Sequence, residues 1–360
     1  MQYFVVLTKE CNLLCKYCGG GSDTPPKEIQ YSIENLKSFL SKDVDPSIEF
    51  YGGEPLLRIG KMKDIMDSVD ARYMVQTNGL LLDRIEPNLL VKFHTILVSI
   101  DGTKMVTDSE RGVGVYERVI RNSRLIRERG FAGDLVARMT VENGTDIEEN
   151  VLHLWGTGLF DHVHWQLSFS MFWKGEVEVE PSLSNWITNY NSGVTRLVNW
   201  WVTQMKQTQR VPGIVPFLGI TDTLLNGEEV TLRCGSGMDS FAVIPDGRIS
   251  ACPVSVDFDF SILGSILTST PLSVVGKAGL GEPCLSCGVY EVCGGRCLFV
   301  NRVQWMLREE GYSLICQTVK HLVSELKLAL PVIRGLIDDG FVDRTAFAYP
   351  EFNNGCEIIP

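Results

Sequence analysis

The sequence lacks long hydrophobic runs and clusters of basic residues. Its apolar runs, such as residues 95–100, are far shorter than the roughly 20 residues that a membrane-spanning helix needs. The N-terminal residues show neither the basic region nor the long apolar region of a signal peptide. Lys and Arg total 33 against 44 Asp and Glu, so the formal net charge is −11. Because phosphate binding calls for clustered cations, we expect a cytoplasmic protein with neither a nucleic acid nor a membrane as partner.

Cysteine is the residue type that stands out, because the chain has eleven. Disulfides are rare in the reducing compartment expected here, and an odd number of cysteines cannot all pair within one chain. The cysteines also fall in closely spaced groups. Such grouping is typical of metal or iron–sulfur ligation.

The first half of the chain alternates short apolar runs with segments of helical periodicity. The expected strands cover residues 3–8, 47–52, 72–77, 95–100, 135–141 and 162–169, and the expected helices cover 32–42, 61–69, 87–93, 115–130 and 146–158. Such alternation predicts an α/β fold built from βαβ units around a parallel sheet. Six units predict a partial (β/α)6 barrel, which stops short of the eight units of a full barrel.

A change in composition divides the chain. Residues 183–210 are expected to form one long helix, and a cysteine-rich region with dense turn residues follows it. We predict a barrel domain with this bridging helix over 1–215, and a small domain with a β-hairpin and helices over 216–330. Residues 331–360 are the end of a last helix and a tail. Pro-Asp-Gly in "IPDGRI" marks the hairpin.

Three cysteines follow the first expected strand. Cys11, Cys15 and Cys18 form the pattern C-x3-C-x2-C. A loop with this spacing can wrap three thiolates around one face of a [4Fe–4S] cluster, whose usual ligand set is four cysteines. With no fourth cysteine nearby, one iron would be open to another ligand. A zinc site is the alternative, although the loop has no histidine.

This loop, with the aromatic Tyr17 before its last cysteine, resembles the signature of the radical S-adenosylmethionine (SAM) superfamily. The resemblance implies that the open iron binds the amino and carboxylate groups of SAM. It also implies that one electron from the cluster cleaves SAM to a 5′-deoxyadenosyl radical. A ferredoxin or flavodoxin would be the expected electron donor, and an anaerobic organism the expected source.

Further residues match the family at the ends of the expected strands. "YGGEP" follows the second strand, where glycine permits close backbone approach and a carboxylate suits an ammonium group. The resemblance implies that the SAM contacts come from Tyr17, Gly52, Gly53, Glu54, Asn78, Ser99, Asp101, Arg111 and Arg138. Turn capping remains an alternative for Asn78, Ser99 and Asp101. A surface salt bridge would explain either arginine equally well.

The second group of cysteines resembles the SPASM domain, which holds auxiliary [4Fe–4S] clusters in this superfamily. The resemblance implies that auxiliary cluster I is bound by Cys234, Cys252 and Cys297, and auxiliary cluster II by Cys284, Cys287, Cys293 and Cys316. The chain would then carry three clusters. A cysteine that fully ligated members place before the first of these is missing here. One iron of cluster I could therefore be open, or Cys356, a carboxylate such as Glu228 or Glu229, or the substrate could complete the ligand set.

The resemblance points to the peptide-modifying branch, and to a subgroup found in methanogenic archaea. We expect oxidative modification of a peptide or protein, such as a thioether or C–C cross-link. Pro253 stands where sulfatase-maturing relatives have an Asp base, which argues against formylglycine formation. No leader-binding domain is expected before the barrel. The alternatives are an enzyme acting on a tetrapyrrole or another small molecule, an iron–sulfur electron carrier, and a zinc-binding module.

Overall fold

A computed structural model describes residues 1–18, 26–173, 182–308, 310–349 and 359–360. The chain forms two compact units, and each is assembled from separate parts of the sequence. The first unit joins Met1–Arg138 with Cys234–Gly279, and the second joins Met139–Arg233 with Leu280 and the described residues after it. The predicted boundaries at 215 and 330 stay a prediction.

The first unit is built on a sheet whose strand order is β5-β4-β3-β2-β1-β7-β8-β9. Neighbours from β5 to β7 pair in parallel, whereas β8 and β9 are antiparallel to their neighbours. The strands are β1 (Gln2–Thr8), β2 (Ser47–Gly52), β3 (Arg72–Thr77), β4 (Phe93–Ser99), β5 (Asp134–Val141), β7 (Ser240–Val243), β8 (Arg248–Ser250) and β9 (Ile262–Ser265). β5 continues past Arg138 into the second unit. All seven residues of β1 are buried, as expected for a parallel strand covered on both faces.

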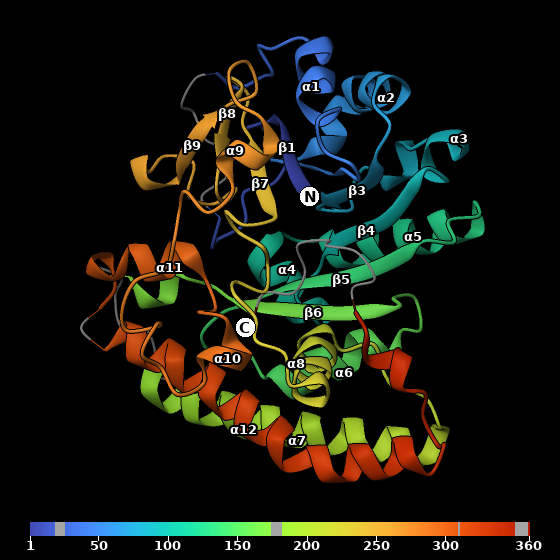
Figure 1. Cartoon of the computed structure of the whole chain (residues 1–360). Helices are drawn as coiled ribbons and strands as arrows, with labels where there is room; N and C mark the ends of the chain where they lie inside the picture. Colours follow the sequence, from blue (N-terminus) through green and yellow to red (C-terminus); the bar gives the residue numbers. More distant parts are fainter. Residues whose placement is uncertain (19–25, 174–181, 309, 350–358) are drawn as a thin grey trace. The chain divides into compact units, whose positions relative to one another are not determined.

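Helices follow the parallel strands of the first unit (Figure 1). They are α1 (Ile33–Leu40), α2 (Ile59–Ser68), α3 (Pro87–Leu90), α4 (Lys104–Arg111), α5 (Val115–Glu128) and α9 (Pro271–Val274). Ser32 begins α1 with a capping box, because its hydroxyl accepts from the backbone of Asn35. Apolar residues of α1 such as Leu36 and Phe39 are completely buried. The helices thereby provide the apolar cover that a parallel sheet needs.

The second unit contains strand β6 (His162–Leu167) and most of the long helices. The helices are α6 (Ile147–Gly156), α7 (Leu183–Thr208), α8 (Val215–Asn226), α10 (Tyr290–Cys293), α11 (Leu298–Arg302) and α12 (Gly311–Asp338). α7 and α12 lie side by side (Figure 1). An aromatic cluster forms the core, in which the rings of Trp165 and Trp201 lie 5.7 and 5.4 Å from the ring of Phe217.

The predicted α/β fold with a parallel sheet is confirmed, and the six expected strands appear as β1 to β6. The hairpin predicted from "IPDGRI" is the antiparallel pair β7 and β8. Helices α4 and α8 were not predicted. Among the described residues, no helix combines the length and apolarity needed to cross a membrane.

Candidate functional site

The first three cysteines lie in the loop that leaves the end of β1. Cys11 and Cys15 are partly buried, Cys18 is exposed, and all three are free thiols. The backbone N–H of Cys18 donates to the carbonyl of Cys15 at 3.0 Å, which closes a turn between them. Burial raises the pKa of Cys15 to about 11, and the nearby charge of Arg111 opposes that effect. The loop therefore presents sulfur donors beside a fixed positive charge.

Two glycines at the end of β2 allow its backbone to pack directly against this loop. A Cβ atom on Gly52 would lie 2.1 Å from the carbonyl oxygen of Thr8, and one on Gly53 would lie 2.1 Å from that of Glu10. The backbone N–H of Gly53 donates to Thr8 at 2.8 Å. Side-chain-bearing residues cannot approach a backbone this closely. The glycines thus hold the start of the cysteine loop against the sheet.

Glu54 follows the glycines and is completely buried. Its carboxylate accepts hydrogen bonds from the backbone N–H of Asn78 at 2.7 Å, from that of Leu56 at 2.9 Å and from the hydroxyl of Thr77 at 2.8 Å. Burial raises the pKa of Glu54 to about 7, against these hydrogen bonds, which lower it. Glu54 therefore ties the ends of β2 and β3 together and can change its charge near neutral pH.

The side chain of Asn78 reaches the cysteine loop. Its amide nitrogen donates to the side-chain oxygen of Asn12 at 2.7 Å and lies 3.9 Å from the sulfur of Cys11. Its amide oxygen accepts from the backbone of Leu80 at 3.0 Å, which caps the turn after β3. Both the predicted site role and the turn-capping alternative are therefore compatible with its position. Asn12 was not among the predicted site residues.

Tyr17, Asp101 and Arg111 form one buried cluster. Arg111 donates to both carboxylate oxygens of Asp101, at 2.7 and 2.8 Å. The hydroxyl of Tyr17 donates to Asp101 at 3.0 Å, and the guanidinium carbon of Arg111 lies 5.4 Å from the centre of the Tyr17 ring. The carboxylate is thus neutralised by a bidentate arginine. These contacts fix the position of Tyr17, and with it the neighbouring cysteines.

Helix α4 carries Arg111 to this place, and it is the element that sequence analysis missed. Lys16 in the cysteine loop donates its backbone N–H to the carbonyl of Glu110 at 3.0 Å. The helix begins at Thr103, whose hydroxyl accepts from the backbone of Val106, and it ends at Gly112. Thr and Gly at these positions are ordinary helix start and stop signals, so the sequence did carry a clue.

Ser99 on β4 and Arg138 on β5 lie opposite each other where these two strands pair. The charge of Arg138 acts on Glu49, a buried carboxyl on β2 that accepts from the side-chain amide of Gln2 at 2.6 Å. Burial raises the pKa of Glu49 to about 8, and Arg138 opposes this shift. The predicted roles of Ser99 and Arg138 stay predictions.

The later cysteines divide between the two units. Cys234 and Cys252 flank the hairpin of the first unit and are partly buried. Cys297, which was predicted to join them on auxiliary cluster I, belongs to the second unit and is buried there. Cys356 lies outside the described residues. The ligand set of auxiliary cluster I stays a prediction.

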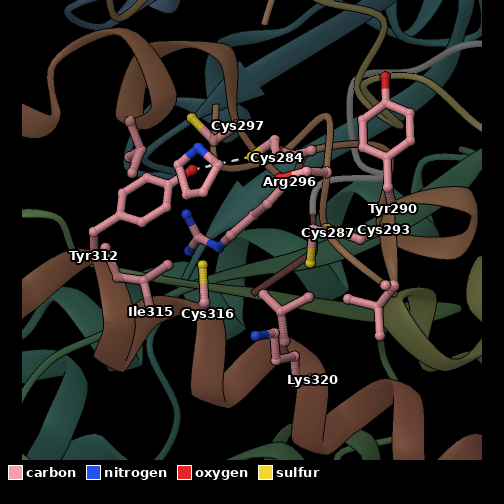
Figure 2. A pocket seen from close by; sticks show the side chains of 17 residues that line it. Cys284, Cys287, Tyr290, Cys293, Arg296, Cys297, Tyr312, Ile315, Cys316 and Lys320 are labelled. Carbon is pink, nitrogen blue, oxygen red and sulfur yellow. Dashed lines mark hydrogen bonds between the residues drawn. The ribbon is translucent and has the colours of Figure 1, made fainter. Parts of the chain in front are cut away.

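Five cysteines of the second unit line one cavity of about 300 Å³ (Figure 2). They are Cys284, Cys287, Cys293, Cys297 and Cys316. Four of them are the cysteines predicted for auxiliary cluster II, and Cys316 reaches the cavity from α12. A cavity lined by thiols from sequence-distant segments has the donor set that an iron–sulfur cluster requires. The residues present therefore fit such a group.

Hydrogen bonds and a charge surround these thiols. The hydroxyl of Tyr312 lies 3.0 Å from the sulfur of Cys284 and accepts from the side-chain amide of Asn301 at 3.3 Å. Burial raises the pKa of Cys293 to about 11, whereas neighbouring backbone N–H groups and the charge of Arg296 lower it. Tyr312 and Arg296 were not predicted from the sequence. Across the described residues, no three His, Cys, Asp or Glu side chains are arranged to hold a single metal ion.

Comparison with known proteins relates the first part of this chain to a known superfamily. Residues 5–154 match the radical SAM superfamily. Mycofactocin maturase MftC of Mycobacterium tuberculosis is 24% identical over 325 residues, which cover 81% of this chain and 76% of that protein. An AdoMet-dependent heme synthase of Methanosarcina barkeri is 29% identical, over 39% of this chain and 43% of that protein. An uncharacterized protein of Archaeoglobus fulgidus is 31% identical, over 32% of this chain and 29% of that protein.

Solved structures share the fold. Native anSMEcpe with bound AdoMet matches with a TM-score of 0.74 at 20% identity, over 94% of this chain and all of that one. Streptococcus suis SuiB, bound to precursor peptide SuiA, matches with a TM-score of 0.57 at 16% identity, over 84% of this chain and 72% of that one. The likeness to a methanogenic subgroup stays a prediction. Residues 5–154 are therefore a radical SAM domain, the relatives indicate that the protein is an enzyme, and a cysteine-rich C-terminal region follows that domain.

Proposed function

We propose that this enzyme oxidatively modifies a peptide or protein, by using SAM bound at a cluster on Cys11, Cys15 and Cys18. The observation that carries the proposal is the packing of the Gly52–Gly53–Glu54 segment against the cysteine loop. When bound, a [4Fe–4S] cluster with an open iron supplies the electron that cleaves SAM to a 5′-deoxyadenosyl radical. A donor of the ferredoxin or flavodoxin type would deliver that electron.

The residues around the loop have separate tasks in this proposal. Gly52 and Gly53 bring backbone close to the methionine part of SAM, and Glu54 offers a carboxylate that accepts a hydrogen bond from its amino group. Asn78 orients the loop beside Cys11. Tyr17, Asp101, Arg111, Ser99 and Arg138 are the further proposed SAM contacts. Of these, Asp101 acts together with Arg111, because each satisfies the other in the structure.

The relatives favour a peptide or protein as the substrate. The mycofactocin maturase aligns with 81% of this chain, whereas the heme synthase aligns with 39% of it. Of the solved structures with this fold, anSMEcpe has been seen with bound Cp18Cys peptide and SuiB with its precursor peptide. Pro253 replaces the Asp base of sulfatase-maturing relatives, so we favour a cross-link over formylglycine formation.

A chain with three clusters suits an oxidation that removes two electrons from the substrate. Hydrogen-atom abstraction removes one electron and one proton from the substrate, and bond closure releases a second electron and a second proton. Auxiliary clusters, at Cys284, Cys287, Cys293 and Cys316 and at Cys234, Cys252 and Cys297, would accept the second electron. The fourth ligand of the latter cluster, with Cys356 among the candidates, and the base that takes the second proton are unassigned.

The reconstituted enzyme tests the substrate class. We expect 5′-deoxyadenosine release under anaerobic reducing conditions to rise when a peptide encoded beside this gene is added. The peptide should lose two mass units, because two hydrogens leave when a cross-link closes. Stimulation by an iron-free tetrapyrrole precursor, with no mass change in the peptide, would favour the runner-up function suggested by the heme synthase relatives.

The pKa of Glu54 predicts a pH dependence of SAM binding. Because burial raises that pKa to about 7, the carboxylate forms only as the pH rises through neutrality. The amino group of SAM donates to the ionised carboxylate, so the dissociation constant of SAM should fall about tenfold from pH 6 to pH 8. Calorimetric titration of the reconstituted enzyme measures this dissociation constant at each pH.

Glu54→Gln is the matched control for this prediction. Its side chain is neutral at both pH values, so its affinity should be nearly flat. The ratio of the two dissociation constants cancels any titration of the SAM amino group itself. An equal pH dependence in both proteins would show that Glu54 does not contact the amino group of SAM.

A further inference from the structure

Cations and thiols line the cavity of the second unit, and the described residues contribute no carboxylate to its lining. Arg296 and Lys320 supply its two basic side chains. Its polar groups also include the hydroxyls of Tyr290, Tyr312 and Ser286. Positive charge without a negative partner in a mostly apolar cavity predicts an anionic occupant.

Arg296 is the more confined of the two cations. Its side chain is only 6% exposed. The Nε and one terminal nitrogen of its guanidinium are buried and have no hydrogen-bond partner among the described residues. Phe169 covers one face of the guanidinium, with its ring centre 5.2 Å from the central carbon, but a phenyl ring accepts no ordinary hydrogen bond. A buried guanidinium that lacks hydrogen-bond partners is unfavourable unless an anionic group lies beside it and balances its charge.

The backbone of Arg296 is also held in an unusual conformation. Its φ of 50° lies in the left-handed region, which residues with a side chain rarely occupy. It lies between Gly295 and Cys297, in the turn that leads from Cys293 to the next helix. Figure 2 shows its guanidinium directed into the cavity, in the vicinity of Tyr312 and Cys316. A left-handed backbone conformation at a residue with a side chain is retained where the surrounding structure or the function requires it.

We propose that Arg296 compensates the negative charge of the iron–sulfur cluster in this cavity and raises its reduction potential. This inference rests on the proposed function, which assigns auxiliary cluster II to the same thiols. Four thiolate ligands give a cluster net negative charge, and acceptance of one electron from the substrate radical adds one more. A fixed cation therefore stabilises the reduced form more than the oxidised form. Arg296 would make the cluster a better electron acceptor.

The reduction potential of the cluster tests the inference. The variants Arg296→Gln and Arg296→Lys are made in the full-length chain in which Cys11, Cys15 and Cys18 are replaced by alanine, so that only auxiliary clusters contribute. We expect R296Q to weaken reduction at least tenfold, which is about 59 mV for a one-electron couple. R296K retains the charge and should keep most of the original potential. Electron paramagnetic resonance during a potentiometric titration measures both.

The results for R296Q and R296K either support or overturn the role of Arg296. An unchanged potential in R296Q, or equal shifts in R296Q and R296K, overturns the inference while the cluster assignment stands. Should R296Q hold no cluster, retention of iron by R296K supports charge compensation, and equal loss from R296K overturns it. If the parent protein itself binds no auxiliary iron, the proposed cluster assignment fails and the inference fails with it.

Discussion

Replacement of Cys11, Cys15 and Cys18 by alanine should abolish 5′-deoxyadenosine release and leave the rest of the protein intact. The three thiols are the sulfur donors of the loop that follows β1, and without them the cluster proposed to bind SAM has no ligands. We expect the iron content to fall from about twelve to about eight atoms per chain, because each [4Fe–4S] cluster contributes four. Iron analysis and chromatography of the cleavage products measure the two effects.

The matched control replaces Cys284, Cys287, Cys293 and Cys316 instead. This variant should lose a similar amount of iron but retain SAM cleavage in the absence of substrate, because those thiols belong to the other compact unit. Product formation should stop in it, since the electron acceptor is gone. Cleavage of SAM that survives in the first variant would refute the assignment of the open iron to this loop.

Gly53→Ala should have the second largest effect. The new Cβ atom would lie 2.1 Å from the carbonyl oxygen of Glu10, which is backbone that cannot swing aside. Either β2 or the start of the cysteine loop must move, and such overpacking costs about 3 kcal/mol or more. We expect a lower free energy of unfolding, together with loss of SAM cleavage. Denaturant titration and the activity assay measure these effects.

Gly60→Ala is a suitable control, because beyond its chain neighbours and the backbone of its own helix no described atom lies within 4 Å of the position where its Cβ would stand. Gly60 lies in α2, where alanine is the better helix former, so this variant should be as stable as the parent or up to about 1 kcal/mol more stable. If Gly53→Ala behaved in the same way, the close approach of the two backbones would not matter for the site.

The strands of the parallel sheet could be predicted from the sequence because each is a short, nearly continuous apolar run. Phe50 and Val75 illustrate the reason: both are completely buried near the middle of strands whose faces are covered, where large apolar residues are favoured. Helix α4 escaped prediction because it is short and mostly polar. Its role is visible only in the structure, where Arg111 donates a hydrogen bond to Asp101.

The cysteine groups and the GGE segment were recognisable because their spacing is local. Some residues that contact these groups could not be recognised from the sequence. Asn12 contacts Asn78 across 66 residues, and Tyr312 contacts Cys284 across 28. Asn12 lies within the first cysteine motif and Tyr312 lies close to Cys316. Neither contact could be predicted, because each depends on two segments that meet only after folding.

The sequence by itself determined the superfamily resemblance, the order of strands and helices in the first half, and the residues able to bind iron, since all of these depend on spacing and periodicity along the chain. The tertiary structure decided the rest. It placed the β7–β8 hairpin beside β1, gathered five thiols around one cavity, and left the guanidinium of Arg296 buried among them. These features arise from contacts between distant segments, whose energies no local pattern records.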